Sequence, residues 1–141
     1  MKLSVRRDEF SLQLTHPNSK LFFVRVVNPD TLFGCVEVSD FRIAENDERL
    51  GYEALEYIWE NFPNLFSLNQ WRFKNIYPQL HDDTVGLNRD CVTKRFDEVT
   101  RLLRMFFEER GILMTNSFLD QSHGRFDSFY EIRKLVATHP K

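Results

Sequence analysis

An amphipathic segment at residues 90–111 constrains the fold more than any other part of the chain. Its apolar side chains recur at three- and four-residue spacing, so at about 100° per residue they fall within an arc of roughly 140°. The opposite arc is charged and includes oppositely charged pairs four residues apart, such as Lys94 and Glu98. The segment predicts a long helix whose buried face consists of Val92, Phe96, Val99, Leu102, Leu103, Phe106 and Phe107.

The residues at both ends of this segment are suited to begin and end a helix. Asp90 is a good N-cap, because its carboxylate can accept hydrogen bonds from the free amides of the first turn. Arg110 complements the negative end of the helix dipole, and Gly111 can adopt the left-handed conformation that closes the last turn. Burying seven such side chains contributes on the order of 10–20 kcal/mol before entropy is subtracted. We therefore expect the core to form around this helix.

The first third of the chain shows the alternation of apolar and polar residues that is typical of strands. The apolar residue Val5 is at an odd position, whereas Leu12 and Leu14 are at even positions. This change predicts a turn near residues 6–9. The nearly continuous apolar run at 21–27 predicts a central strand, and residues 33–43 predict another strand. Short connections favour antiparallel neighbours, because parallel strands need a crossover of a dozen or more residues.

The remaining segments complete the predicted fold. Residues 47–62 predict a second helix, and residues 70–76 and 112–114 suit short strands. Residues 126–137 predict a terminal helix that follows a loop at 116–125. The predicted class is α+β, with an N-terminal antiparallel β-meander of three to four strands packed against two to three amphipathic helices in one layer-pair core. A single domain at 1–141 is expected. The alternative is a cone-shaped sheet and helix fold that encloses an apolar cavity lined by phenylalanine.

Charge and hydropathy limit the class of protein. The chain has 141 residues and a formal net charge of -2, so it has no overall attraction to nucleic acid or to anionic lipid. Charged residues interrupt the N-terminal stretch where a signal peptide needs an apolar run, and no run approaches the ~20 residues of a membrane span. We therefore expect a cytoplasmic protein that binds no membrane, and we favour protein over nucleic acid as its partner.

Sequence motifs for catalysis are absent. The chain contains neither a G-x-S-x-G elbow nor a Gly-rich phosphate loop. His81, Asp82 and Asp83 are metal-binding residue types, but adjacent side chains seldom converge on one ion, so a polar turn is the favoured interpretation. Cys91 lies in the first helical turn, where the dipole can lower a thiol pKa, yet the simpler prediction for Cys35 and Cys91 is two reduced, buried thiols. We expect no catalytic residue, metal or cofactor, and we favour a non-enzymatic protein.

Acidic residues are concentrated in one part of the chain. Residues 37–60 hold eight acids against Arg42 and Arg49. Within the helix predicted at 47–62, three glutamates share one side and are flanked by two aromatic side chains. Such a surface can attract a basic partner and anchor it through the rings. The sequence thus predicts a binding module that recognises a protein partner with a basic surface through Tyr52, Glu53, Glu56, Trp59 and Glu60.

Two alternative functions and the oligomeric state are left open by the sequence. Aromatic residues make up 14% of the chain, which suits a small-molecule-binding protein or cofactor-free enzyme with an aromatic-lined cavity. A basic sheet face beside Trp71 and Phe73 would instead suit single-stranded nucleic acid, since bases stack on aromatic rings. A homo-oligomer is compatible with the sequence. The basic residues of that second alternative are Arg6, Arg7, Lys20, Arg25, Arg72 and Lys74.

Overall fold

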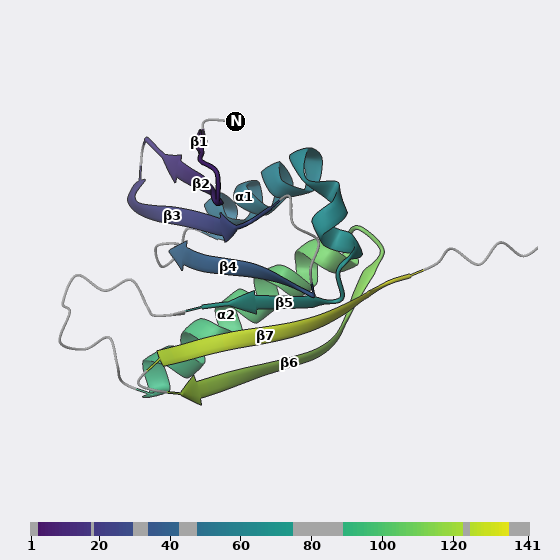
Figure 1. Ribbon diagram of the computed structural model, residues 1–141. Coiled ribbons are helices and arrows are strands. Elements are labelled where there is room, and N and C mark those ends of the chain that lie inside the picture. Colours follow the sequence, from purple (N-terminus) through teal and green to yellow (C-terminus); the bar gives the residue numbers. More distant parts are fainter. Residues whose placement is uncertain are drawn as a thin grey trace, which may run out of the picture.

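A computed structural model describes residues 3–17, 19–29, 34–42, 48–74, 89–122 and 125–135 (Figure 1). In this part of the chain a seven-stranded sheet is combined with two α-helices. The elements are, in order, β1 (Ser4–Arg7), β2 (Ser11–His16), β3 (Ser19–Val27), β4 (Cys35–Arg42), α1 (Glu48–Asn61), the 3-10 helix η1 (Pro63–Ser67), β5 (Gln70–Phe73), α2 (Arg89–Glu108), β6 (Ile112–Ser122) and β7 (Arg125–Lys134).

The predicted fold class is wrong, because the sheet is larger and mixed. Its strand order is β1-β2-β3-β4-β5-β7-β6. The expected antiparallel meander corresponds to β1–β4 alone, and β5, β7 and β6 extend it. The connection from β4 to β5 passes through α1, and this crossover makes β4 and β5 parallel neighbours. Two α-helices are described, where two to three were expected.

The predicted terminal helix at 126–137 is also wrong, since residues 125–134 form strand β7. Phe126, Ser128, Tyr130 and Ile132 are buried, with two-residue spacing, whereas Phe129 lies between them and is half-buried. Ser128 concealed this alternation in the sequence, because a small polar residue occupies a core position of the strand. The loop predicted at 116–125 forms most of β6 and the start of β7, and β6 and β7 pair antiparallel along their length.

The amphipathic segment forms α2 as predicted, and its faces are confirmed. Val92, Leu103, Phe106 and Phe107 are all fully buried. Val99 and Leu102 are also buried, and Phe96 is half-buried against the same core. Gly111 has a φ of 72° in the turn that follows the helix, the left-handed conformation expected there. The side chain of Asp90 lies outside the described residues, so its predicted capping role stays a prediction.

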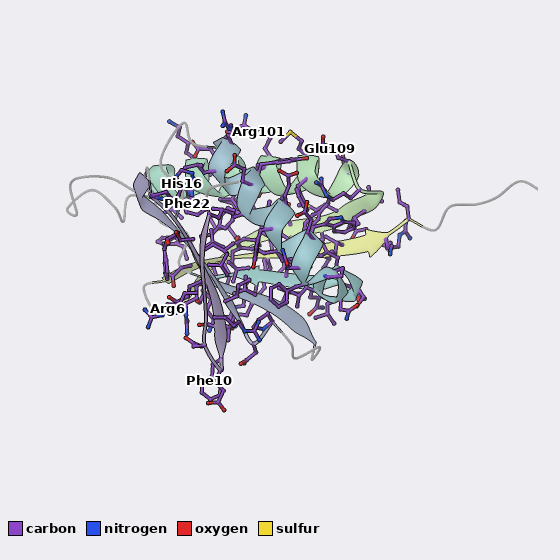
Figure 2. The ribbon with its side chains drawn as sticks, turned by 90° about the horizontal axis from the view of Figure 1, so that it is seen from above. Arg6, Phe10, His16, Phe22, Arg101 and Glu109 are labelled. Carbon is purple, nitrogen blue, oxygen red and sulfur yellow. The ribbon has the colours of Figure 1, made fainter. Side chains whose placement is uncertain are left out.

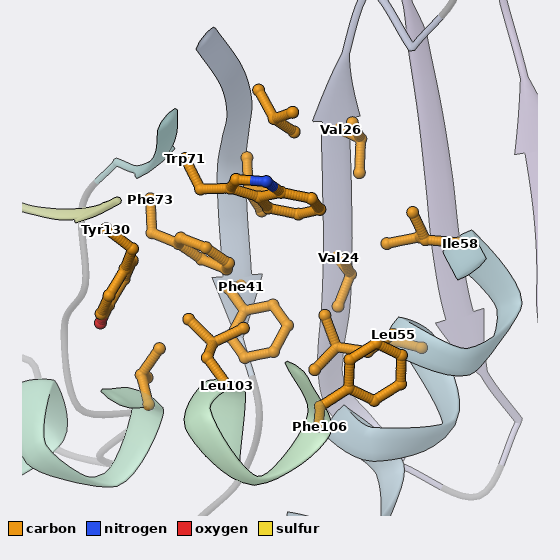
Figure 3. Packing of buried hydrophobic residues seen from close by; sticks show 14 of the residues in the cluster. Val24, Val26, Phe41, Leu55, Ile58, Trp71, Phe73, Leu103, Phe106 and Tyr130 are labelled. Carbon is orange, nitrogen blue, oxygen red and sulfur yellow. The ribbon is translucent and has the colours of Figure 1, made fainter. Parts of the chain in front are cut away.

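Both helices lie on one side of the sheet, and the core fills the space between the helices and the sheet. Figure 2 shows this arrangement from above, with Arg101 and Glu109 on the outer side of the helices. Figure 3 shows the contact region, where Trp71 and Phe73 of β5 face Leu103 and Phe106 of α2. The ring centroids of Trp71 and Phe107 are 5.6 Å apart. The aromatic residues therefore serve chiefly to fill the core, as large apolar side chains do in a well-packed interior.

Candidate functional site

The five residues predicted to bind a partner all lie on α1, but their surroundings differ. Glu60 is exposed, whereas Tyr52, Glu53, Glu56 and Trp59 are half-buried. The rings of Tyr52 and Trp59 both pack edge-on against Phe106 of α2, with centroids 5.3 and 6.5 Å from it. These two aromatic side chains thus contribute to the contact between the helices as well as to the surface.

Arg110 organises this contact between α1 and the end of α2. Its guanidinium lies 3.7 Å from the centroid of the Phe106 ring, and also over the rings of Tyr52 and Trp59 at 5.4 and 5.7 Å. Arg110 Nη1 donates to the Tyr52 hydroxyl at 3.1 Å, and Arg110 Nη2 lies 3.8 Å from Glu56 Oε2. A planar cation surrounded by aromatic faces and a carboxylate is a stabilising arrangement. Part of the predicted stripe is therefore engaged within the molecule.

The acidic surface is nevertheless broader than the sequence indicated. Glu109 follows α2 and is exposed, and its Oε1 accepts a hydrogen bond from the Tyr52 hydroxyl of α1 at 2.9 Å; its neighbour Glu108, the last residue of α2, is also exposed. Glu53 is paired with Arg49 at 3.5 Å, and the Arg49 side chain is 90% exposed. Sequence reasoning missed the α2 residues because they lie far from α1 along the chain and become its neighbours only on folding. We define the acidic surface as Glu53, Glu56, Glu60, Glu108 and Glu109.

The basic and aromatic residues proposed for nucleic acid do not share one face. Trp71 and Phe73 are fully buried under the helices. Arg72 alternates with them on the opposite face and pairs with Asp127 at 2.8 Å, and Lys74 pairs with Glu37 at 3.0 Å. Arg6 and Arg7 are exposed on β1, and Arg25 on β3 donates to Ser39 at 2.9 Å. The side chain of Lys20 lies outside the described residues.

The face of the sheet away from the helices, called the open face here, has a stacked pair of aromatic rings on β6 and β7. Phe118 and Phe129 stack with their centroids 4.9 Å apart, and Phe118 is 46% exposed. The guanidinium of Arg72 lies over the Phe129 ring at 5.2 Å. The open face therefore has a small aromatic platform whose neighbouring cation is neutralised by Asp127.

The most distinctive feature of the backbone is the pairing of β4 with β5. Among the described strands this pair alone is parallel, and it lies in the middle of the sheet. The pairing extends from Cys35 and Gln70 to Val38 and Phe73. Beyond Val38, β4 continues beside β3 to Arg42, whereas β5 ends. The carboxyl ends of the two strands thus lie side by side, and β4 extends further than β5. We call this place the β4–β5 edge; it is formed by strand ends and differs from the edge strands β1 and β6.

Charged groups are held close to this edge. Arg95 of α2 is 7% exposed, donates to the carbonyl oxygen of Phe41 at 3.2 Å and contacts Glu98 at 3.5 Å. Lys74 follows directly after β5, and its amide donates to the Val38 carbonyl oxygen at 2.9 Å. Both α1 and α2 begin at this edge (Figure 1). Helix amino ends carry partial positive charge, so the edge is favourable for a negative group.

A groove of about 590 Å³ lies between α2 and β6. Its floor includes Thr100, whose hydroxyl is 3.0 Å from the Tyr130 hydroxyl. Burial raises the pKa of Tyr130 to about 12, so its hydroxyl stays protonated at neutral pH. The lining residues are Lys94, Phe96, Asp97, Glu98, Thr100, Arg101, Arg104 and Ser117.

The described residues give no support for catalysis by a cysteine or for a metal site. Cys35 is free and only half-buried, in contrast to the buried thiol expected. Burial, with a contribution from Glu37, raises the pKa of this thiol, which disfavours the reactive thiolate. His81, Asp82, Asp83 and the side chain of Cys91 lie outside the described residues. Within the described ranges no three His, Cys, Asp or Glu side chains form a group that could hold a metal ion.

The helices can be compared with membrane-spanning helices, and the chain with known proteins. In the described part of the chain, neither helix has the length and apolar character needed to cross a membrane. Searches against models of protein families, curated proteins and solved structures find no match to this chain.

Proposed function

We propose that the protein binds a negatively charged small molecule at the sheet edge where β4 and β5 end. The observation that carries this proposal is the parallel β4-α1-β5 unit in the middle of an otherwise antiparallel sheet. In open, mostly parallel α/β sheets, ligands bind beyond the carboxyl ends of the strands where the strand order reverses, and we expect the same of this single unit. A small-molecule site is the first alternative suggested by the sequence, and we propose it at this edge instead of in an aromatic cavity.

The electrostatics of the edge favour an anion over a cation. Both α-helices begin there, and their dipoles attract negative charge, although Glu48 already lies in the first turn of α1. Lys74 and Arg95 add two side-chain cations, although Glu37 and Glu98 partly compensate them. Since the carboxylates contact the side-chain cations, the helix ends are the groups that distinguish this edge.

Amide chemical shifts of the ¹⁵N-labelled protein test this proposal. Titration with inorganic pyrophosphate and with adenosine diphosphate is expected to shift amides at residues 40–42, 48–51 and 73–74. Lys74→Glu should weaken binding several-fold, because it places a negative charge at the edge. Lys134→Glu is the matched control, since this exposed lysine ends β7 at the opposite edge. Shifts confined to other regions, or equal effects of the two variants, would refute the site.

The acidic surface supports a second candidate function, recognition of a protein with a basic surface. Three carboxylates share one side of α1, Glu109 contacts that helix through the Tyr52 hydroxyl, and Met105 of α2 is 47% exposed. Mixed acidic and apolar character of this kind steers a basic partner and contributes contact area. The engagement of Tyr52 and Glu56 with Arg110 makes Glu53 and Glu60 the better probes, because changing them leaves that contact intact.

Affinity capture from a cell extract, at low and at raised salt, tests the second candidate. The double variant Glu53→Lys and Glu60→Lys should lose the salt-sensitive partners. Glu9→Lys with Glu131→Lys is the control, since both of these acids are exposed elsewhere. If the two double variants retain the same partners, the acidic surface has no such role.

A further inference from the structure

The two edges of the sheet are protected to very different extents. β1 has four residues, SVRR, and its two arginines discourage pairing with another strand. β6, at the other edge, has 11 residues, ILMTNSFLDQS, and contains no lysine, arginine or proline. Within the described part of the chain, β6 pairs with β7 alone. Its outer side thus offers a row of backbone donors and acceptors.

The segment of β6 from Asn116 to Ser122 is regular enough to accept another strand. A bulge between Met114 and Asn116 interrupts the β6–β7 register, and from Asn116 to Ser122 the pairing is continuous. Seven residues at about 3.3 Å each span roughly 23 Å. A regular segment of this length is sufficient for an extended peptide to bind by strand addition.

The side chains next to this segment differ between the two faces of the sheet. On the helix side, Ser117 faces the groove, where Lys94, Arg101 and Arg104 of α2 provide three cations against Asp97 and Glu98. The charged residues that line the groove therefore carry one formal positive charge in excess, and Glu98 also contacts Arg95. On the open side, Phe118 is 46% exposed and stacked on Phe129. One face thus favours acidic side chains and the other favours apolar ones.

The spacing of the cations agrees with an extended occupant. From Lys94 to Arg104, α2 advances about 15 Å at 1.5 Å per residue. An extended chain covers that distance in about five residues, and its side chains alternate between the two faces. A strand added to β6 would therefore direct every second side chain towards the groove and the others towards Phe118.

We propose that the outer edge of β6 binds an extended peptide segment with acidic side chains on one face and apolar side chains on the other. The segment becomes an eighth strand, held by backbone hydrogen bonds to β6 and by ion pairs with Arg101 and Arg104. This binding surface is distinct from the β4–β5 edge and from the acidic surface. It selects an acidic partner, whereas the acidic surface would select a basic one. A second copy of the chain is a poorer occupant, because β6 itself carries just one acid, Asp120.

A labelled nine-residue peptide that alternates acid and valine, with serine at both ends, is a direct probe. Fluorescence anisotropy should detect its binding, and amide shifts should concentrate at residues 116–120. A peptide of the same charge with prolines in place of two valines should bind at least about tenfold more weakly, because proline removes backbone donors. Equal binding of the two peptides would show simple charge attraction and would overturn the proposal.

Protein variants separate this surface from the others. Arg101→Glu with Arg104→Glu should weaken binding of the valine peptide about tenfold or more, since both exposed cations line the groove. Arg6→Glu with Lys134→Glu makes the same charge change at exposed positions elsewhere and should leave the affinity unchanged. No binding by the unmodified protein, or a concentration-dependent dimer that Phe118→Lys dissociates, would also overturn the proposal; the dimer would identify a second copy as the occupant.

Discussion

At the scale of single residues, position on α2 decides what a side chain contributes. Phe106 is fully buried, and its ring contacts Tyr52, Trp59, Phe66 and Phe107. Arg104, two positions earlier, is exposed. The helix rotates by about 100° per residue, so residues two positions apart lie about 200° apart and face opposite environments.

Phe106→Ala is expected to lower the free energy of unfolding by about 3–5 kcal/mol, because it leaves a cavity among four aromatic rings. Arg104→Ala should change it by no more than about 0.5–1 kcal/mol. Chemical denaturation with a common slope for both variants measures the difference. Similar losses in the two variants would contradict the assigned faces of α2.

Arg110 presents a different case, since a charged residue stabilises an aromatic contact. Its side chain is 17% exposed and is held by the three rings and Glu56. Arg110→Ala should cost about 1–2 kcal/mol of stability, through lost stacking and lost packing of the side-chain stem. Arg110→Lys retains the charge but not the planar group, so it should recover part of that loss. Full recovery would mean that charge alone matters and that stacking contributes little.

At the scale of elements, the β1–β2 turn shows how one carboxylate fixes a hairpin. Asp8 Oδ1 accepts hydrogen bonds from the amides of Phe10 and Ser11, both at 2.8 Å, and Oδ2 accepts one from the Ser11 hydroxyl at 3.0 Å. These contacts, with the Phe10 amide foremost, lower the pKa of Asp8 below its ordinary value. Asp8 therefore accounts for the change of parity in this segment.

The lowered pKa predicts a stability change in acid. Because the ionised form is favoured in the folded state, the contribution of Asp8 is present above the pKa of the unfolded chain and is lost as pH falls through the folded pKa. Asp8→Asn should therefore be less stable than the unmodified protein at neutral pH, and the difference should shrink in acid. NMR titration of the Asp8 carboxyl should give a midpoint below 3.8, the ordinary value. A midpoint at or above that value would contradict this account.

The elements that the sequence predicted correctly are those with an undisturbed apolar period. α1, α2, β3 and β4 each carry such a pattern, and their predicted bounds lie within a few residues of those observed. β7 and most of β6 were missed, because the polar Ser128 breaks the apolar alternation at a buried position of β7 and because β6 is an edge strand with polar positions exposed. The acidic surface shows the same limit. The sequence predicts which residues share one side of α1, but Glu109 and Arg110 become their neighbours through helix packing, and the binding role of these residues stays a prediction.

At the scale of the whole molecule, the sheet joins the two halves of the chain. β5 lies between β4 of the N-terminal half and β7 of the C-terminal half, and it pairs with both. The aromatic cluster adds a second link, because Phe66 of η1 contacts Trp59 of α1, Trp71 of β5 and Phe106 of α2. Neither half of the sheet can bury its apolar face without the other, which favours a single cooperative unit.

Cooperative unfolding is therefore the expected behaviour, and substitutions far apart in sequence should affect the same transition. Val24→Ala in β3 and Ile132→Ala in β7 remove fully or nearly fully buried side chains from opposite halves. Each should lower the midpoint of thermal unfolding, and tryptophan fluorescence and far-ultraviolet circular dichroism should report one coincident transition in both variants. The exposed Val5 on β1 supplies the control, because Val5→Ala should shift the midpoint little. Two separated transitions, with each variant moving just one of them, would show that the halves fold independently and that β5 does not couple them.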